Sequence, residues 1–178
     1  VHRGALGTRM KTDGDMSQLE YSVGDYVVYP AHGVGRISGI EVFTMGEQEV
    51  QLYAIIFEKE RMTLKVPTMK AKRAGLRKLS SKDRIKAAME TLKGPSRVRR
   101  VMWSRRAQEY EAKINSGDPV SIAEVVRDLH RANDQPEQSY SERQIYQAAL
   151  ERLARELAAV ERIDERSATL KLEEVLAK

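Results

Sequence analysis

The sequence contains no cysteine, which excludes disulfide bonds and thiolate metal ligands. It also contains no run of about 18 consecutive apolar residues, the length that a membrane-spanning helix requires. The first residues lack the apolar core of a secretory signal peptide. We therefore expect a protein that works in the cytoplasm and does not contact the membrane.

Motifs of enzymes and metalloproteins are scarce as well. The histidines, His2, His32 and His130, are far apart in the sequence, a pattern that disfavours a metal site. The segment Gly33-Val34-Gly35 lacks the third glycine and the following helix of a dinucleotide-binding loop. No Walker-type phosphate loop occurs. No nucleophilic residue is followed or preceded by a basic partner at a spacing typical of a catalytic pair. We predict that the chain is not an enzyme and uses no cofactor or metal.

What the sequence does have is an uneven distribution of charge. The 178 residues carry a net charge of +5 at pH 7. Residues 1–68 hold 7 basic and 9 acidic side chains, whereas residues 69–113 hold 15 basic and only 4 acidic ones. Such a basic belt can be a solvated helix surface, but it also suits a polyanionic partner. We favour contact with nucleic acid.

The pattern of residues 20–68 is typical of a small β-sheet. Met45-Gly46-Glu47 has the composition of a hairpin turn, and Lys59-Glu60-Arg61 that of a second tight turn. The expected strands are Tyr26–Tyr29 before Pro30, Arg36–Phe43, Val50–Phe57, and Met62–Val66 before Pro67. This many short strands predict a strongly bent sheet or small barrel with at least one open edge.

Beyond residue 80, apolar residues recur at helical spacing. Ser80 or Ser81 can cap one helix and Ser96 another, and Ser121 and Ser141 each open a capping box with an acid or amide three residues later. The expected helices begin at these residues and end near Leu92, Asn115, Asn133 and Ile163, and a last helix holds Leu170, Leu172, Val175 and Leu176. We predict a five-helix bundle.

These patterns together predict an α+β chain of two domains. Residues 1–19 show no sustained period and are interpreted as a flexible tail or a partial expression scar. Residues 20–69 form the expected sheet domain, 70–80 a basic connector, and 81–178 the helical domain. Each expected domain is long enough to build a core of its own.

The only tryptophan lies within an arginine-rich segment, Arg97–Arg106. If this segment is helical, Arg99, Trp103 and Arg106 lie roughly on one side, with Arg100 at the margin. Guanidinium groups bind phosphates in pairs of hydrogen bonds, and an indole can stack on or wedge beside an unpaired base. A lone tryptophan is also often a core residue, so both interpretations of Trp103 stay open here.

Five segments of the chain, in the same order, resemble the CarD/CdnL family of bacterial transcription regulators. The matching segments are VGDYVVYPAHGVG (Val23–Gly35), TLKVP (Thr63–Pro67), WSRR (Trp103–Arg106), SGDP (Ser116–Pro119) and AEVVRDLHR (Ala123–Arg131). The resemblance covers about residues 20–178. Its specificity comes from the order of the segments, because each one alone is short.

The resemblance implies a Tudor-like first domain that binds the β subunit of bacterial RNA polymerase, largely through a strand edge. The polymerase contacts that we infer from it are Val42, Phe43 and Lys65. Lys65 matches a basic position of the family. Phe43 stands where the family often has another basic residue, so the details of that contact differ here.

The resemblance also implies that the helical domain contacts promoter DNA at the upstream edge of the transcription bubble. Trp103 would act as a wedge in the distorted minor groove, with Arg105 and Arg106 near the phosphates and Arg99 and Arg100 nearby. We therefore expect a regulator of transcription initiation that stabilises the open promoter complex with little sequence specificity. It would bind polymerase as a monomer and lie in the cytoplasm, associated with the nucleoid through polymerase.

Two other functions are compatible with the residues. A sequence-specific DNA-binding repressor would use the basic helix for recognition and would need a dimer or a clear helix-turn-helix. An interaction adaptor that does not bind DNA would use the sheet to hold a partner strand and would bury Trp103.

Overall fold

A computed structural model of the protein describes residues 19–132 and 135–177. These residues form two compact units. The first unit contains the described residues up to Tyr29 together with Val34–Lys78, and the second contains Pro30–Gly33 and Leu79 onward. The predicted tail lies outside the described residues, apart from residue 19.

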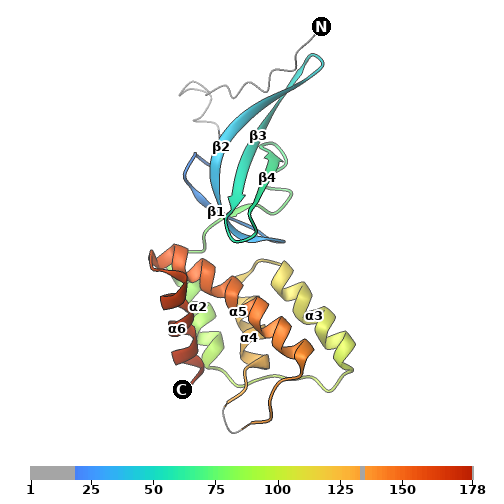
Figure 1. The fold of residues 1–178 in the computed structure, drawn as a ribbon, viewed down its shortest axis with the longest axis vertical. Coiled ribbons are helices and arrows are strands. Elements are labelled where there is room, and N and C mark those ends of the chain that lie inside the picture. Colours follow the sequence, from blue (N-terminus) through green and yellow to red (C-terminus); the bar gives the residue numbers. More distant parts are fainter. Residues whose placement is uncertain (1–18, 133–134, 178) are drawn as a thin grey trace. The chain divides into compact units, whose positions relative to one another are not determined.

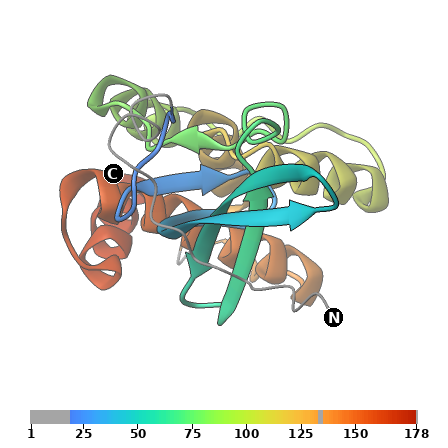
Figure 2. The same cartoon turned by 90° about the horizontal axis from the view of Figure 1, so that it is seen from above.

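The sheet of the first unit has five antiparallel strands (Figure 1). The strands are β1 (Tyr26–Tyr29), β2 (Gly33–Met45), β3 (Gln48–Phe57), β4 (Met62–Pro67) and β5 (Arg77–Lys78), in the spatial order β4-β3-β2-β1-β5. Seen from above in Figure 2, the strands run in clearly different directions, as in a strongly twisted sheet. The four predicted strands are confirmed as β1 to β4.

The hairpin between β2 and β3 has the predicted turn. Met45 pairs with Gln48, so that Gly46 and Glu47 alone connect the strands. Gly46 has a φ of +60°, a conformation that most other residues resist. The turn fixes the register of the hairpin, and the register decides which side chains enter the core.

One face of the sheet packs into a core that includes Tyr53, Ile37 and Phe57. Gly35 lies in β2 directly against this core, because a Cβ atom here would be 2.7 Å from Ile55 Cγ2 and 2.8 Å from Phe57 Cε1. A larger residue at this position would therefore push buried side chains apart.

The segment expected to be a connector, residues 70–80, is partly built into the sheet. Its strand β5 pairs Lys78 with Val27 of β1. Ala71 and Leu76 are buried, and the Tyr21 hydroxyl donates a hydrogen bond to the Leu76 carbonyl at 3.3 Å. The strand was not predicted because it is only two residues long and both of its residues are basic, whereas the apolar residues that hold the segment lie outside it.

The second unit contains five helices among the described residues. They are α2 (Lys82–Lys93), α3 (Trp103–Asn115), α4 (Pro119–Leu129), α5 (Tyr140–Glu161) and α6 (Glu165–Leu176). Buried residues from all five form one hydrophobic cluster, in which Leu129, Leu157 and Leu172 are among the largest fully buried side chains. The number of helices was predicted correctly.

Two helices begin earlier than predicted, because other residues cap them. Asp118, not Ser121, caps α4: its carboxylate accepts hydrogen bonds from the Ser121 backbone N–H (3.2 Å) and hydroxyl (2.9 Å). Ser139, not Ser141, caps α5 and accepts from the Glu142 N–H at 3.2 Å. Helix α4 also ends at Leu129 instead of near Asn133. In both cases the first available cap fixes the start of the helix.

The start of α3 differs most from the prediction. The helix begins at Trp103 and not at Arg97, and residues 94–102 have no regular structure. The Ser96 hydroxyl donates to the Asp128 carbonyl (3.3 Å), and the Arg97 N–H donates to Asp128 Oδ1 (2.9 Å). The Ser96 hydroxyl and the Arg97 N–H, which could have helped to start a helix, are therefore hydrogen-bonded to α4. A helix that began here would also place several arginines at the positive end of its dipole, which is unfavourable.

The Asp118 cap makes stability depend on pH. Burial raises the pKa of Asp118, but hydrogen bonds from Arg84 and Ser121 outweigh it and lower the pKa below its ordinary 3.8. A lowered folded-state pKa means that this stabilisation is present above the ordinary pKa and is lost as pH falls through the folded-state value.

We expect Asp118→Ala to lower the free energy of unfolding of the second unit by about 0.5–2 kcal/mol at neutral pH. Urea denaturation monitored by the fluorescence of Trp103 measures this free energy, since Trp103 is the only tryptophan of the sequence. The difference from wild type should shrink as the pH falls below 3.8. Asp83→Ala, in the first turn of α2, is the control; an equal loss there would contradict the role of the cap.

Candidate nucleic-acid interface

Exposed arginines surround the start of α3. Arg99 and Arg100 lie in the irregular segment before the helix, and Arg105 lies in its first turn. Among the described residues, the guanidinium groups of Arg100 and Arg105 form no ion pair, so their charge is available to a partner. Exposed arginines therefore lie on both sides of the start of α3, although only Arg105 of these three is helical.

Trp103 is the first residue of α3 and is half-buried. Its ring packs against the hydrophobic cluster of the helices, and its Nε1–H donates to the Ser141 hydroxyl at 3.1 Å. Trp103 is thus attached to the core but keeps part of its surface exposed. The sequence left a core position and an exposed position open for Trp103, and the structure shows a ring that is partly in the core and partly exposed.

Arg106 contacts two aromatic rings of its own helix. Its Cζ lies 5.3 Å from the centroid of the Trp103 ring and 5.6 Å from that of Tyr110. Its Nη2 donates to the Tyr110 hydroxyl at 3.2 Å. Residues 103, 106 and 110 are spaced to share a helix face, and a cation near aromatic faces is attracted by them. The sequence prediction placed Arg106 beside phosphates, whereas its guanidinium is engaged within the chain.

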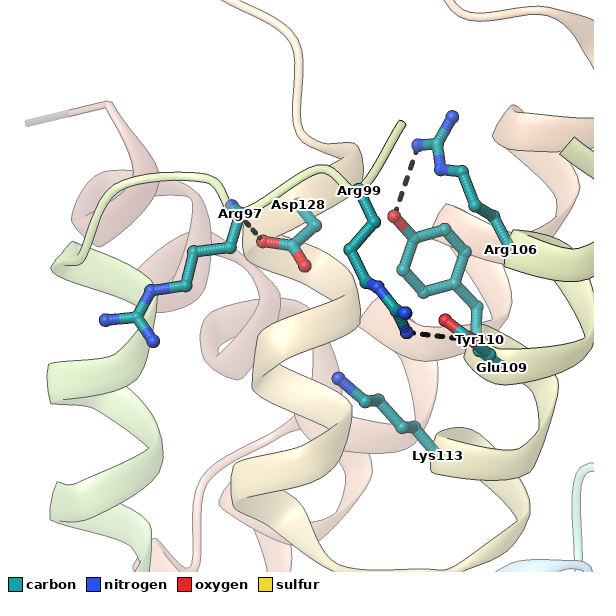
Figure 3. Close-up of a pocket in the computed structure, with 7 residues that line it drawn as sticks. All are labelled: Arg97, Arg99, Arg106, Glu109, Tyr110, Lys113 and Asp128. Atoms are coloured by element: carbon teal, nitrogen blue, oxygen red, sulfur yellow. Dashed lines mark hydrogen bonds and ion pairs between the residues drawn. The ribbon is translucent and has the colours of Figure 1, made fainter. Parts of the chain in front are cut away.

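A small polar pocket lies beside this face (Figure 3). Arg99 Nη1 donates to Glu109 Oε1 at 3.1 Å across it. Lys113 also lines the pocket and forms an ion pair with Glu124 at 2.7 Å. The complete lining is Arg97, Arg99, Arg106, Glu109, Tyr110, Lys113 and Asp128. The pocket brings Arg99 and Arg106 together, although they do not share a helix.

Asp128 is the residue of this region that the sequence analysis missed. It is 4% exposed and accepts hydrogen bonds from the Arg97 N–H and from Arg127 Nε, each at 2.9 Å. These contacts fix the arginine-rich segment against α4. The only signal in the sequence is an acidic residue between the apolar positions Val126 and Leu129.

The three residues predicted to contact polymerase lie in the first unit but not on one face. The core row of the sheet runs from Ile40 through its strand partners Tyr53 and Val66, all of them buried. Side chains alternate along a strand, so Phe43 and Lys65 lie on the face opposite this row, and Val42 lies on the same face as Ile40.

Phe43 is 42% exposed, and Lys65 forms an ion pair with Glu41 at 2.9 Å. The structure therefore brings Phe43 and Lys65 to one surface and separates Val42 from them.

Other kinds of site were sought in the part of the chain that the structure describes. Residues 19–132 and 135–177 contain no cluster of histidine, aspartate or glutamate side chains that could hold a metal ion. No helix in these ranges is long and apolar enough to cross a membrane.

Comparison with known proteins gives two family matches that together span most of the chain. Residues 21–80 match the CarD-like/TRCF RID domain, and residues 87–173 match the CarD C-terminal domain. A Bacillus subtilis (strain 168) protein named "Putative transcription factor YdeB" is 32% identical over 146 residues, which cover 82% of this chain and 95% of that protein. The chain therefore belongs to the CarD family of transcription factors.

Proposed function

We propose that the protein binds the β subunit of RNA polymerase through its first unit and stabilises the open promoter complex through its second. The match of residues 21–80 to a domain shared with the polymerase-interacting domain of transcription-repair coupling factor supports the polymerase contact. In this proposal the sheet is a Tudor-like domain, and the helices form a five-helix bundle that contacts DNA. The protein acts as a monomer on polymerase.

The observation that carries the DNA part of the proposal is a partly exposed indole with cations around it. Trp103 is attached to the core on one side, while the exposed Arg100 and Arg105 flank it. An aromatic ring stacked at the edge of a bubble, with phosphate contacts beside it, can stabilise unpaired DNA by about 1–3 kcal/mol. This energy shifts the equilibrium between closed and open DNA by about 5- to 150-fold.

The weak DNA affinity of one small basic surface is sufficient under this proposal. Phosphate contacts are sensitive to salt and carry no sequence information. Attachment to polymerase raises the local concentration of the helical unit at the promoter, so that neither high affinity nor base readout is needed. The proposal thus includes little sequence specificity.

For the polymerase contact we propose the outer edge of β4 and the surface of Phe43 and Lys65. Strand β4 is at one end of the sheet order, and an open edge can accept a strand from a partner. Lys65 lies on β4 itself, next to that edge. Val42 faces the other side of the sheet and is not part of this surface.

The test is the lifetime of an open complex formed by bacterial RNA polymerase on an unstable promoter. We expect wild-type protein to lengthen the lifetime and Trp103→Ala to lose most of that effect, because the ring that stacks on DNA is gone. Trp103→Phe should retain part of it, since an aromatic face remains.

Folding and polymerase binding of each variant are measured first, by circular dichroism and by co-purification with polymerase. An unchanged effect of Trp103→Ala would refute the wedge while leaving the polymerase contact in place. No effect of the wild-type protein would favour the adaptor, and a tight footprint on a palindromic site without polymerase would favour the repressor.

A further inference from the structure

The half-buried indole of Trp103 is held by three side chains, which we call the Trp103 clamp: Arg106, Tyr110 and Ser141. Two of them lie one and two turns further along α3, and Ser141 comes from the first turn of α5. The Trp103 and Tyr110 ring centroids are 6.2 Å apart with an angle of 50° between the ring planes. The guanidinium of Arg106 lies close to both rings.

The environment of Arg106 differs from that of its neighbour Arg105. Arg106 is half-buried, and its Nη2 donates to the Tyr110 hydroxyl. Its Nε is enclosed by protein and has no hydrogen-bond partner among the described residues. Arg105 is exposed. A paired phosphate contact through Nε and Nη2 would cost Arg106 its hydrogen bond to Tyr110 and would require its enclosed Nε to be exposed, whereas Arg105 needs no such rearrangement.

Ser141 fixes the other end of the indole. Its hydroxyl oxygen accepts the hydrogen bond from Trp103 Nε1, which is the only polar group of the side chain. The hydroxyl is free for this role because Ser139, and not Ser141, caps α5. The contacts with Arg106 and Tyr110 on α3, together with the hydrogen bond that the indole donates to Ser141 of α5, restrict both side-chain torsions of the tryptophan.

We propose that Arg106 and Ser141 are positioning residues that hold Trp103 in its DNA-binding orientation before DNA is present, and that Arg106 does not neutralise a DNA phosphate. The role on DNA rests on the proposed function, whereas the clamp itself is a property of the free protein. A side chain that is already ordered loses less conformational entropy on binding, so the clamp strengthens the contact of the ring with DNA.

The first experiment compares Arg106→Met with Arg105→Met in the free protein. Methionine keeps an unbranched apolar side chain and removes the charge. Because Trp103 is the only tryptophan, its emission reports this one position. We expect Arg106→Met to move the emission to longer wavelength and to increase quenching by acrylamide, while Arg105→Met leaves both unchanged. Equal spectra for Arg106→Met and wild type, with the fold intact, would overturn the clamp.

The second experiment measures the salt dependence of association with polymerase-bound promoter DNA. Loss of one phosphate contact reduces the slope of log K against log salt by about 0.9. We expect this reduction for Arg105→Met and not for Arg106→Met. The latter should instead shorten the open-complex lifetime about two- to fivefold at every salt concentration, as the loss of a partly exposed cation–π contact implies. A slope reduced equally by both variants would show that Arg106 contacts phosphate.

Three further variants keep the proposal testable if Arg106→Met folds poorly. Arg106→Lys keeps the charge but loses the planar group that lies against the rings. A positioning role predicts that its Trp103 emission is shifted as in Arg106→Met, whereas a role in phosphate contact alone predicts the wild-type emission. Ser141→Ala should change the Trp103 emission, and Ser141→Thr, which restores a hydroxyl, should reverse that change. If the emission responds in this way but wild-type protein has no effect on open complexes, the clamp stands and the proposed function fails.

Discussion

Asp128→Ala is expected to lower the free energy of unfolding of the second unit by about 3–5 kcal/mol, because it leaves a largely buried arginine without its partner. The Arg127 side chain is 13% exposed, and its Nε donates to Asp128 Oδ1 at 2.9 Å. The same oxygen accepts from the Arg97 N–H, so the substitution also releases the segment before α3. Urea denaturation followed by Trp103 emission measures the loss.

Glu111→Ala is the control for this experiment. Glu111 is an exposed acid of α3, and its replacement should change the free energy of unfolding by less than about 0.5 kcal/mol. Asp128→Asn keeps an oxygen for the Arg97 N–H but loses the charge. Its loss of unfolding free energy should lie between those of Asp128→Ala and Glu111→Ala. If Asp128→Ala were as stable as Glu111→Ala, the buried carboxylate would not fix the arginine-rich segment.

Phe57→Ala is expected to lower the free energy of unfolding of the first unit by about 3–5 kcal/mol, the usual cost of removing a buried aromatic ring. Phe57 is 2% exposed, and its ring lies against the backbone of Gly35. Hydrogen exchange of the β2 and β3 amides is the appropriate measurement, because the only tryptophan lies in the other unit.

The chain supplies its own control, since it has two phenylalanines. Phe43 is 42% exposed, so Phe43→Ala should leave amide protection in β2 and β3 almost unchanged while weakening binding to polymerase. The reverse pattern, with fast exchange for Phe43→Ala and protection for Phe57→Ala, would mean that the sheet packs on its other face.

Features of the fold that depend on neighbouring residues could be predicted from the sequence. The strand β4 was predicted because Met62, Leu64 and Val66 alternate with polar residues and Pro67 follows. The hairpin turn at Gly46 was predicted because few residues other than glycine accept its backbone conformation. The helical repeat of apolar residues in α5 was visible from Ile145 to Val160. These signals are local, so no knowledge of the tertiary structure was needed.

The starts of the helices were predicted less well, because several residues compete for the same role. Ser96 has the composition of a cap, but its hydroxyl bonds to α4 instead. Ser141 also resembles a cap, yet Ser139 precedes it and takes the role. The outcome of each competition depends on which partner a side chain meets in the folded protein, and a single sequence does not contain that information.

The candidate interface shows the same difference between local signals, which the sequence contains, and tertiary contacts, which it does not. The sequence located Trp103 and the arginines, since a basic segment with one aromatic residue is visible without a structure. It could not distinguish Arg105 from Arg106, because the difference arises from the ring of Tyr110 and the packing of α5 against α3. Asp128 was missed for a similar reason: its partner Arg97 lies 31 residues away in the sequence.

The unequal lengths of the strands have a consequence for solubility. Pairing with β4 begins at Leu52, so in the described chain Gln48, Glu49 and Val50 pair with β2 alone and present an open edge. Open edges are the usual starting points of aggregation. Glu47 and Glu49 are exposed at this edge, and a second copy that approached it edge to edge would bring the same negative charges together. We therefore expect these glutamates to oppose edge-to-edge association of two copies where the hairpin extends beyond β4.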